Sequence, residues 1–304
     1  MNKLVEDIQK LKKEKDAVIL VHNYQLPEVQ DIADYLGDSL DLSTKAKLVD
    51  NKVIVFCGVH FMAETAYILS PHKTVILPDL TSGCPLADMI TKQDVINLKK
   101  RYPGVPIVGY INTSAEVKSE IDYCCTSANA VDIVSKISSY DVIFLPDKYL
   151  GSYVQRTTKK NLILWHGYCS THIKILKEDI LMLKQHYPDA KVVVHPECSL
   201  EVQEVADKIA GTAGMIKYVQ QNPEVKVFII GTEVGMCYRL KKLFPDKEFI
   251  PASKLAVCPN MKKNTLEKIL FSLETLEPKI VVDEEIRKKA LNSINKMYEL
   301  QDKT

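Results

Sequence analysis

The strongest constraint on the fold of this chain is an internal repeat with spacings of 85 to 88 residues. The three copies span 18–39, 105–127 and 191–212, and read VILVHNYQLPEVQDIADYLGDS, VPIVGYINTSAEVKSEIDYCCTS and KVVVHPECSLEVQEVADKIAGT. In each copy a β-branched run precedes polar residues, an acidic amphipathic helix and a final Ser or Thr. Tyr110 lies 88 residues after His22, and His195 lies 85 residues after Tyr110. Such a period predicts one structural unit per copy.

Strands and helices alternate through every unit, and the strands are apolar along nearly their whole length. This pattern is typical of parallel sheets covered by helices on both faces. We therefore expect an α/β fold of three similar three-layer α/β/α domains, each with a four-stranded parallel sheet, related by a pseudo-threefold axis. The expected domains are residues 1–86, 87–172 and 173–262. The last segment, 263–304, is expected to pack back on the first domain through an amphipathic helix over 284–300.

Charge and composition exclude several classes of partner. The chain has 304 residues and a net charge of +1, which predicts no strong attraction to nucleic acid or to an anionic membrane surface. No apolar run approaches the roughly 20 residues needed to span a bilayer. The charged start MNKLVEDIQKLKKEKD lacks the apolar stretch of a signal peptide, so a cytoplasmic location is expected. In that reducing compartment the eight cysteines are not expected to form disulfides.

Three cysteines follow the repeat. Cys169 lies 85 residues after Cys84, and Cys258 lies 89 after Cys169, each shortly after the last strand of its unit. A pseudo-threefold axis would bring the three thiolates together. Three thiolates suit an iron–sulfur cluster and would leave one iron of a [4Fe–4S] cluster open as a Lewis acid. Three cysteines with His172 would also satisfy zinc, and the sequence pattern leaves both metals open.

Polar residues follow the predicted strands where the next helix begins. Ligands of open parallel sheets bind at these carboxyl ends, beside helix N-termini. If three sheets point this edge at one axis, the polar groups converge. The residues concerned are His22, Ser39, Tyr110, Asn112, Ser127, His195, Glu197 and Thr212.

Short motifs occur in a fixed order along nearly the whole chain. They are HNYQLPEVQDIADYLGDS, TSGCPLADM, YINTSAE, TSANAV, GYCSTH, HPEC, GTAGM, GTEVGM and VCPNMKKNTL. In these motifs the chain resembles the A-type quinolinate synthases, iron–sulfur transferases of bacterial and archaeal NAD synthesis. The resemblance implies three homologous α/β domains around a [4Fe–4S] cluster. It also implies condensation of iminoaspartate (iminosuccinate) with dihydroxyacetone phosphate to quinolinate, phosphate and water.

The resemblance also implies roles for residues. Cys84, Cys169 and Cys258 would hold the cluster, and Tyr24 and His172 would join the active site. The iminoaspartate contacts would be His22, Ser39, Tyr110, Asn112, Ser127, His195, Glu197 and Thr212. Glu197 is the expected general base, because a carboxylate among imidazoles can have a tuned pKa. Tyr24, His22 and His195 would shuttle protons. Ser39, Ser127 and Thr212 would hold carboxylates and phosphate at helix N-termini.

Two positions depart from the pattern of the family. Some members carry CxxCxxC around the last ligand, whereas Cys258 stands alone, which removes any redox switch between neighbouring cysteines. Gly211 stands where relatives can carry Ser, so one hydroxyl contact to substrate would be absent. An aspartate oxidase or dehydrogenase would supply iminoaspartate. The rival functions are another iron–sulfur hydro-lyase, a cluster-bearing sensor and an α/β binding module without metal.

Overall fold

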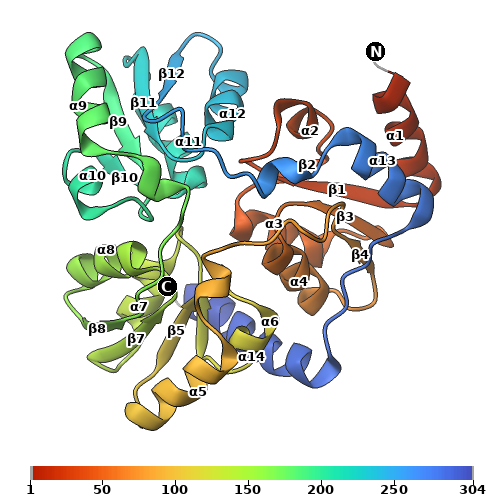
Figure 1. Cartoon of the computed structure of the whole chain (residues 1–304), viewed down its shortest axis with the longest axis horizontal. Coiled ribbons are helices and arrows are strands. Elements are labelled where there is room, and N and C mark those ends of the chain that lie inside the picture. The colour runs from red at the N-terminus through yellow and green to blue at the C-terminus, as the bar shows by residue number, and fades with distance from the viewer. Residues whose placement is uncertain (1–2, 303–304) are drawn as a thin grey trace.

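The computed structural model describes residues 3–302 and contains three four-stranded, all-parallel sheets, as the repeat predicts (Figure 1). The first has the order β2 (Tyr35–Gly37), β1 (Ala17–His22), β3 (Val53–Cys57), β4 (Thr74–Ile76). The second has the order β6 (Tyr123–Cys125), β5 (Ile107–Tyr110), β7 (Asp141–Leu145), β8 (Asn161–Leu164). The third has the order β10 (Lys208–Ile209), β9 (Lys191–Val194), β11 (Val227–Gly231), β12 (Glu248–Pro251). The three sheets form three lobes around a common centre.

Equivalent helices connect the strands of each unit. The first unit has α1 (Lys3–Glu14), α2 (Pro27–Asp31), α3 (Ser39–Leu48) and α4 (His60–Leu69). The second has α5 (Lys92–Arg101), α6 (Ala115–Lys118), α7 (Ala130–Lys136) and α8 (Lys148–Thr158). The third has α9 (Lys177–His186), α10 (Leu200–Glu204), α11 (Thr212–Gln221) and α12 (Gly235–Leu243). Helix α2 ends at Asp31, and residues 35–37 then pair with β1 as an edge strand.

An aspartate at the equivalent position of each unit holds the turn before the edge strand. The carboxylates of Asp34, Asp122 and Asp207 each accept a hydrogen bond of 2.8 Å from the first strand of their own unit. The donors are the backbone N–H groups of Ile19, Ile107 and Val192. A side chain thus ties the turn before the edge strand to the amino end of the first strand.

A lysine repeats at the amino end of each fourth strand. Lys73, Lys160 and Lys247 direct their ammonium groups at the backbone carbonyls of a neighbouring loop. Lys247 donates to the carbonyls of Pro223 and Val225 at 2.8 and 2.6 Å. These lysines satisfy backbone acceptors at the sheet edge opposite to the carboxyl ends, so their contribution is to stability.

The chain after the third unit returns to the first two. Helix α13 (Leu266–Thr275) packs on α1 and β3 of the first unit. Helix α14 (Glu284–Asp302), predicted to pack on the first domain, instead lies mainly against α6, β6 and α7 of the second, with a lesser contact to α4. Its buried side chains Ala290, Ile294 and Met297 complete a hydrophobic core that the first two units share. Because this core is shared, α14 packs on the second unit as well as on the first. The boundaries of the three domains in the sequence remain predictions.

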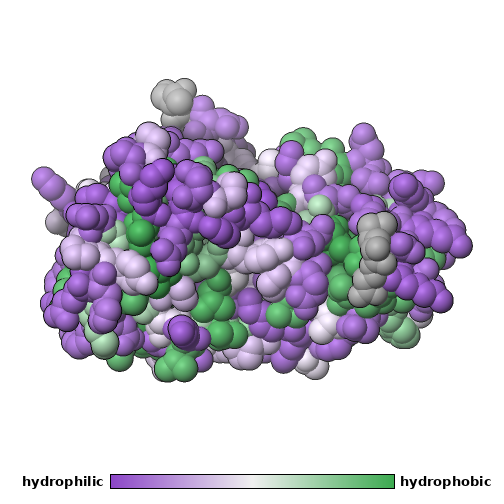
Figure 2. Space-filling view, turned by 90° about the horizontal axis from the view of Figure 1, so that it is seen from above, coloured by the Kyte–Doolittle hydropathy of each residue, from purple (hydrophilic) through white to green (hydrophobic). Residues whose placement is uncertain are grey.

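Within residues 3–302 no helix is both long and apolar enough to cross a membrane. From above, polar side chains cover most of the face, and apolar side chains form separate patches between them (Figure 2).

Replacing Lys247 with Met should lower the free energy of unfolding by about 2–4 kcal/mol, because buried carbonyls lose their donor. Activity should stay near that of the parent, since Lys247 lies at the edge remote from the cavity described below. Chemical denaturation and a kinetic assay on the same sample measure both quantities. A large loss of kcat with unchanged stability would contradict this assignment.

Candidate active site

A cavity at the centre of the three lobes collects side chains from every unit. It holds about 890 Å³ of space not filled by atoms, its mouth included. All thirteen residues selected from the sequence line it: His22, Tyr24, Ser39, Cys84, Tyr110, Asn112, Ser127, Cys169, His172, His195, Glu197, Thr212 and Cys258. The carboxyl ends of three parallel sheets therefore do meet at one place, as the repeat predicts.

The three repeat cysteines occupy equivalent positions in this cavity. Each precedes a short 3₁₀ turn: Ala87–Met89, His172–Lys174 or Met261–Lys263. Each sulfur accepts hydrogen bonds from the backbone N–H groups two and three residues ahead. Burial nevertheless raises the pKa of the Cys84 thiol to about 12, and the nearby Cys258 adds to the shift. Backbone donors aimed at buried sulfurs suit thiolates whose charge a metal would offset.

The cavity also contains a compact set of possible metal ligands. Among residues 3–302, Cys169, His172 and Glu197 each offer a ligand atom within 4.8 Å of the other two. Cys84 and Cys258 line the same cavity. The donor set therefore fits a metal group and includes the three thiols of the repeat.

A chain of hydrogen bonds joins Glu197 to Tyr24 and includes residues of all three units. His172 Nδ1 lies 2.8 Å from Glu197 Oε2 and 3.1 Å from Cys169 Sγ. His172 Nε2 lies 2.8 Å from Thr232 Oγ1, which in turn lies 2.6 Å from the Tyr24 hydroxyl. An ionised carboxylate only accepts hydrogen bonds, so Nδ1 carries the proton and Nε2 can accept one from Thr232.

Opposing effects set the charge of Glu197. Burial alone would raise its pKa, but His172 and His195 outweigh burial, with hydrogen bonds from His172 and Tyr110. The net result lowers the pKa of the Glu197 carboxyl from 4.5 to about 2. Glu197 is therefore an anion at neutral pH, and a weaker base than an ordinary glutamate.

Two histidines in equivalent positions are neutral. Burial and the neighbouring Lys262 lower the pKa of His22 to about 3, against a raising effect of Glu197. Burial also lowers the pKa of His195 to about 3, and His172 and His22 add to the shift against Glu197. The His195 ring stacks on His172 with centroids 4.6 Å apart. Both imidazoles can donate a neutral N–H to a ligand without bringing a charge.

The hydroxyl residues lie close to the helix starts expected for them. Ser39 and Thr212 are the first residues of α3 and α11, and Ser127 precedes α7 by three residues. The N-cap of α3 is Asp38, whose carboxylate accepts from the N–H groups of Leu40 and Asp41. The hydroxyl of Ser39 is therefore not needed as a cap.

Gly211 makes room for another of these hydroxyls. A Cβ placed on Gly211 would lie 2.8 Å from Ser127 Oγ. A serine at position 211 would therefore displace the Ser127 hydroxyl. The absence of a side chain at Gly211 is thus matched to the observed place of Ser127.

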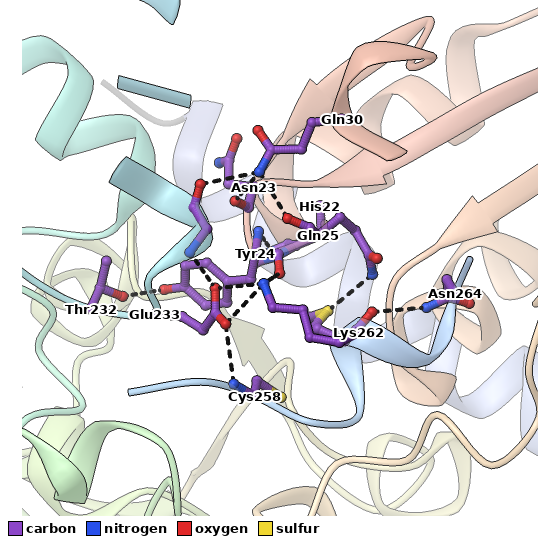
Figure 3. A network of polar contacts seen from close by, with 12 residues as sticks. His22, Asn23, Tyr24, Gln25, Gln30, Thr232, Glu233, Cys258, Lys262 and Asn264 are labelled. Carbon is purple, nitrogen blue, oxygen red and sulfur yellow. Dashed lines mark hydrogen bonds and ion pairs between the residues drawn. The ribbon is translucent and has the colours of Figure 1, made fainter. Parts of the chain in front are cut away.

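Sequence reasoning did not select several polar residues at the cavity and behind it. Asn23 Nδ2 donates to Thr212 Oγ1 at 2.9 Å, and Thr232 completes the hydrogen-bond chain described above. Glu233 Oε1 accepts from the N–H of Cys258 at 3.1 Å, and Lys262 Nζ lies 3.0 Å from the same oxygen (Figure 3). Lys262 also donates to the Tyr24 carbonyl. Thr232 and Glu233 directly follow β11, so the strand-end rule, applied to the third strand of each unit, would have found them.

Comparisons with known proteins agree with this arrangement. A model of the family described as "Quinolinate synthetase A protein" matches residues 6–299. The chain is 55% identical over 293 residues to a quinolinate synthase of Dehalococcoides mccartyi strain 195, covering 96% of this chain and 97% of the relative. It is 52% identical to the quinolinate synthase of Thermodesulfovibrio yellowstonii, over 99% of each chain. It is 49% identical to quinolinate synthase 1 of Methanosarcina acetivorans, over 99% of this chain and 98% of the relative.

The two neutral histidines predict how stability depends on pH. In the unfolded chain each binds a proton near pH 6.5, whereas in the fold each binds one only near pH 3. Unfolding therefore takes up protons between these values, and stability falls as the pH is lowered through this window. Replacing His195 with Gln should reduce the slope by up to about 1.4 kcal/mol per pH unit.

Denaturant unfolding of metal-free, anaerobic protein between pH 6.5 and 4.5 measures this slope. His186→Gln is the matched control, because His186 is an exposed residue of α9. Equal slopes for the His195 variant and the parent protein would contradict the neutral state of His195.

Proposed function

Because this chain belongs to the quinolinate synthase family, a family of NAD biosynthesis, we propose that it condenses iminoaspartate with dihydroxyacetone phosphate to quinolinate, phosphate and water. The observation that carries the proposal is that all three repeat cysteines and the ten polar residues selected from the sequence, from all three units, line one cavity. A substrate with two carboxylates and one with a phosphate both need several hydrogen-bond donors at one place. The cavity offers them on all sides.

Iron–sulfur chemistry is a property of the family, and the residues present fit such a group. Cys84, Cys169 and Cys258 would hold a [4Fe–4S] cluster through their sulfurs. Their meeting in one cavity and the backbone N–H donors at each sulfur support this assignment. Such a cluster with three cysteine ligands supplies an open iron that acts as a Lewis acid on a carboxylate or hydroxyl oxygen.

Neutral donors on the walls would bind the two substrates. His22 and His195 can each present an N–H to a carboxylate without the cost of burying a further charge. Ser39 and Thr212 begin α3 and α11, where hydroxyl and backbone N–H groups favour an anion. Asn112 has a buried Oδ1 with no hydrogen-bond partner among the described residues, which leaves that atom for a substrate donor.

The hydrogen-bond chain through Thr232 would move protons. The Tyr24 hydroxyl can take a proton from the substrate while passing its own to Thr232, which passes one to His172 Nε2. Glu197, ionised and 2.8 Å from Nδ1, would stabilise the resulting imidazolium. We therefore propose that His172 is the group that accepts and holds the proton. In this path Glu197, expected from the sequence to be the general base, would be the electrostatic partner of His172.

An anaerobic assay of purified protein tests the reaction. Iminoaspartate, formed in place from aspartate by an oxidase or a dehydrogenase, and dihydroxyacetone phosphate should give quinolinate and phosphate, with iron and sulfide measured on the same sample. Iron-loaded protein that forms no quinolinate but dehydrates a hydroxy acid would point to another hydro-lyase. Colourless, iron-free protein after anaerobic preparation would remove the cluster from the proposal. Cys84→Ala should lose iron, whereas Cys57→Ala, at a buried strand residue, should keep it.

Thr232 gives a sharper test of the proton path. Thr232→Val preserves shape but removes the hydroxyl between Tyr24 and His172, so kcat should fall by roughly 10²-fold or more. Thr232→Ser keeps the hydroxyl and should retain most of kcat. Steady-state kinetics with matched iron content compares the two variants. Equal kcat values for Val and Ser would exclude a path through this residue.

A further inference from the structure

One buried polar position recurs in the short helix that follows the first strand of each unit. It is the last residue of the sequence E-V-Q, E-V-K or E-V-Q in the three repeats, and is occupied by Gln30, Lys118 and Gln203. Lys118 lies 88 residues after Gln30, and Gln203 lies 85 after Lys118. All three side chains are buried, at 4%, 0% and 3% exposure. A buried polar side chain at a fixed place in every unit indicates a shared task, because its desolvation is costly unless it is hydrogen-bonded.

Each of these side chains holds the loop that leaves the first strand of its own unit. Gln30 Nε2 donates to the carbonyls of Asn23 and Gln25 at 3.1 and 3.0 Å. Gln203 Nε2 donates to the carbonyls of Pro196 and Cys198 at 2.9 and 2.8 Å.

The ammonium group of Lys118 does the same in the second unit, where it donates to the carbonyl of Thr113. The three loops carry the cavity residues His22 and Tyr24, Tyr110 and Asn112, and His195 and Glu197.

Each position also reaches the neighbouring unit. Gln30 Nε2 donates to the carbonyl of Gly235 on α12 at 3.1 Å, a contact drawn in Figure 3. Gln203 Oε1 accepts from Arg156 Nη2 on α8 at 2.5 Å. Lys118 Nζ lies over the ring of Phe61 on α4, 5.4 Å from its centroid.

Helices α4, α8 and α12 are themselves equivalent, each following the third strand of its sheet. The three contacts therefore run from the first unit to the third, from the third to the second, and from the second to the first. The short helices α2, α10 and α6 contact the same partners, α12, α8 and α4.

We propose that Gln30, Lys118 and Gln203 form a closed ring of positioning residues, each of which fixes one substrate-binding loop against the adjacent unit. The proposal rests on the proposed function, since the loops matter only as parts of the site. The three residues do not line the cavity and act through the carbonyls that they hold. What the position requires is a hydrogen-bond donor directed at the loop, since glutamine and lysine share that property and little else. The contact with the adjacent unit differs in each case. It links the position of the loop to the packing between the two units.

The residues equivalent to Lys118 in the other two units indicate a conservative replacement, because both are glutamine. Lys118→Gln restores the residue of the other two units and keeps a donor. Lys118→Met keeps the chain length and apolar stem but removes the donor. The Gln variant should keep kcat within about twofold. The Met variant should lose on the order of 10²-fold in kcat, because a displaced loop misplaces Tyr110 and Asn112.

Hydrogen exchange of the holoenzyme separates positioning from general stability. Lys118→Met should raise amide exchange over residues 110–114 while leaving 22–25 and 195–198 near the parent rates. Lys73→Met is the matched control, because Lys73 is a buried lysine that also donates to backbone carbonyls but lies away from the cavity. It should lower stability with kcat within twofold and with unchanged exchange in the three loops.

Arg156→Met is a second test of the ring, which removes a contact between two units without replacing a buried residue. Arg156 is exposed, and its loss should lower kcat roughly tenfold and raise exchange over residues 195–198. Native kcat and native exchange in both Lys118→Met and Arg156→Met would overturn the ring. If the parent protein formed no quinolinate, the proposed reaction would fail, and loop exchange would still decide whether the ring exists.

Discussion

Three parallel sheets can share one cavity only if their carboxyl ends point inward together, and this constraint governs the chemistry of the centre. Polar groups from three units are forced into a space from which much of the water is excluded. Each must then find a partner or lose its charge. His22 and His195 become neutral, whereas Glu197 stays ionised beside His172 and Tyr110, which both donate hydrogen bonds to it.

The amino ends and the carboxyl ends of the strands have different functions in each sheet. At the amino ends, aspartates and lysines repeat in all three units and satisfy backbone groups, so their chemistry is the same three times. At the carboxyl ends the cysteine is also the same three times, whereas the position of His22, Tyr110 and His195 differs from unit to unit. Identity is kept where each unit supplies the same backbone partner or the same thiol, and it is lost where the cavity has different groups on different sides.

The repeat predicted the three sheets and most residues of the cavity, because the alternation of strands and helices and the period can both be read directly from the sequence. Tyr24 and His172 were selected from the family resemblance. It did not predict the place of α14, since an amphipathic helix records that one face is buried but not which neighbour buries it. The roles of Thr232 and Glu233 were missed because the ends of the third strands were not considered. The low pKa of Glu197 could not be read from its neighbours in sequence, since the groups that set it come from three different segments.

His22, Tyr110 and His195 occupy the equivalent position of the three units. Because the three units are parts of one chain, this position can hold a different residue in each of them. Three separate copies of one unit would present the same side chain three times, and a cavity with exact threefold symmetry gives every side of a bound molecule the same surroundings. In a single chain this position can hold two imidazoles and a phenol. The centre is therefore able to tell one end of an unsymmetrical substrate from the other, which a ring of identical subunits could not do at its axis.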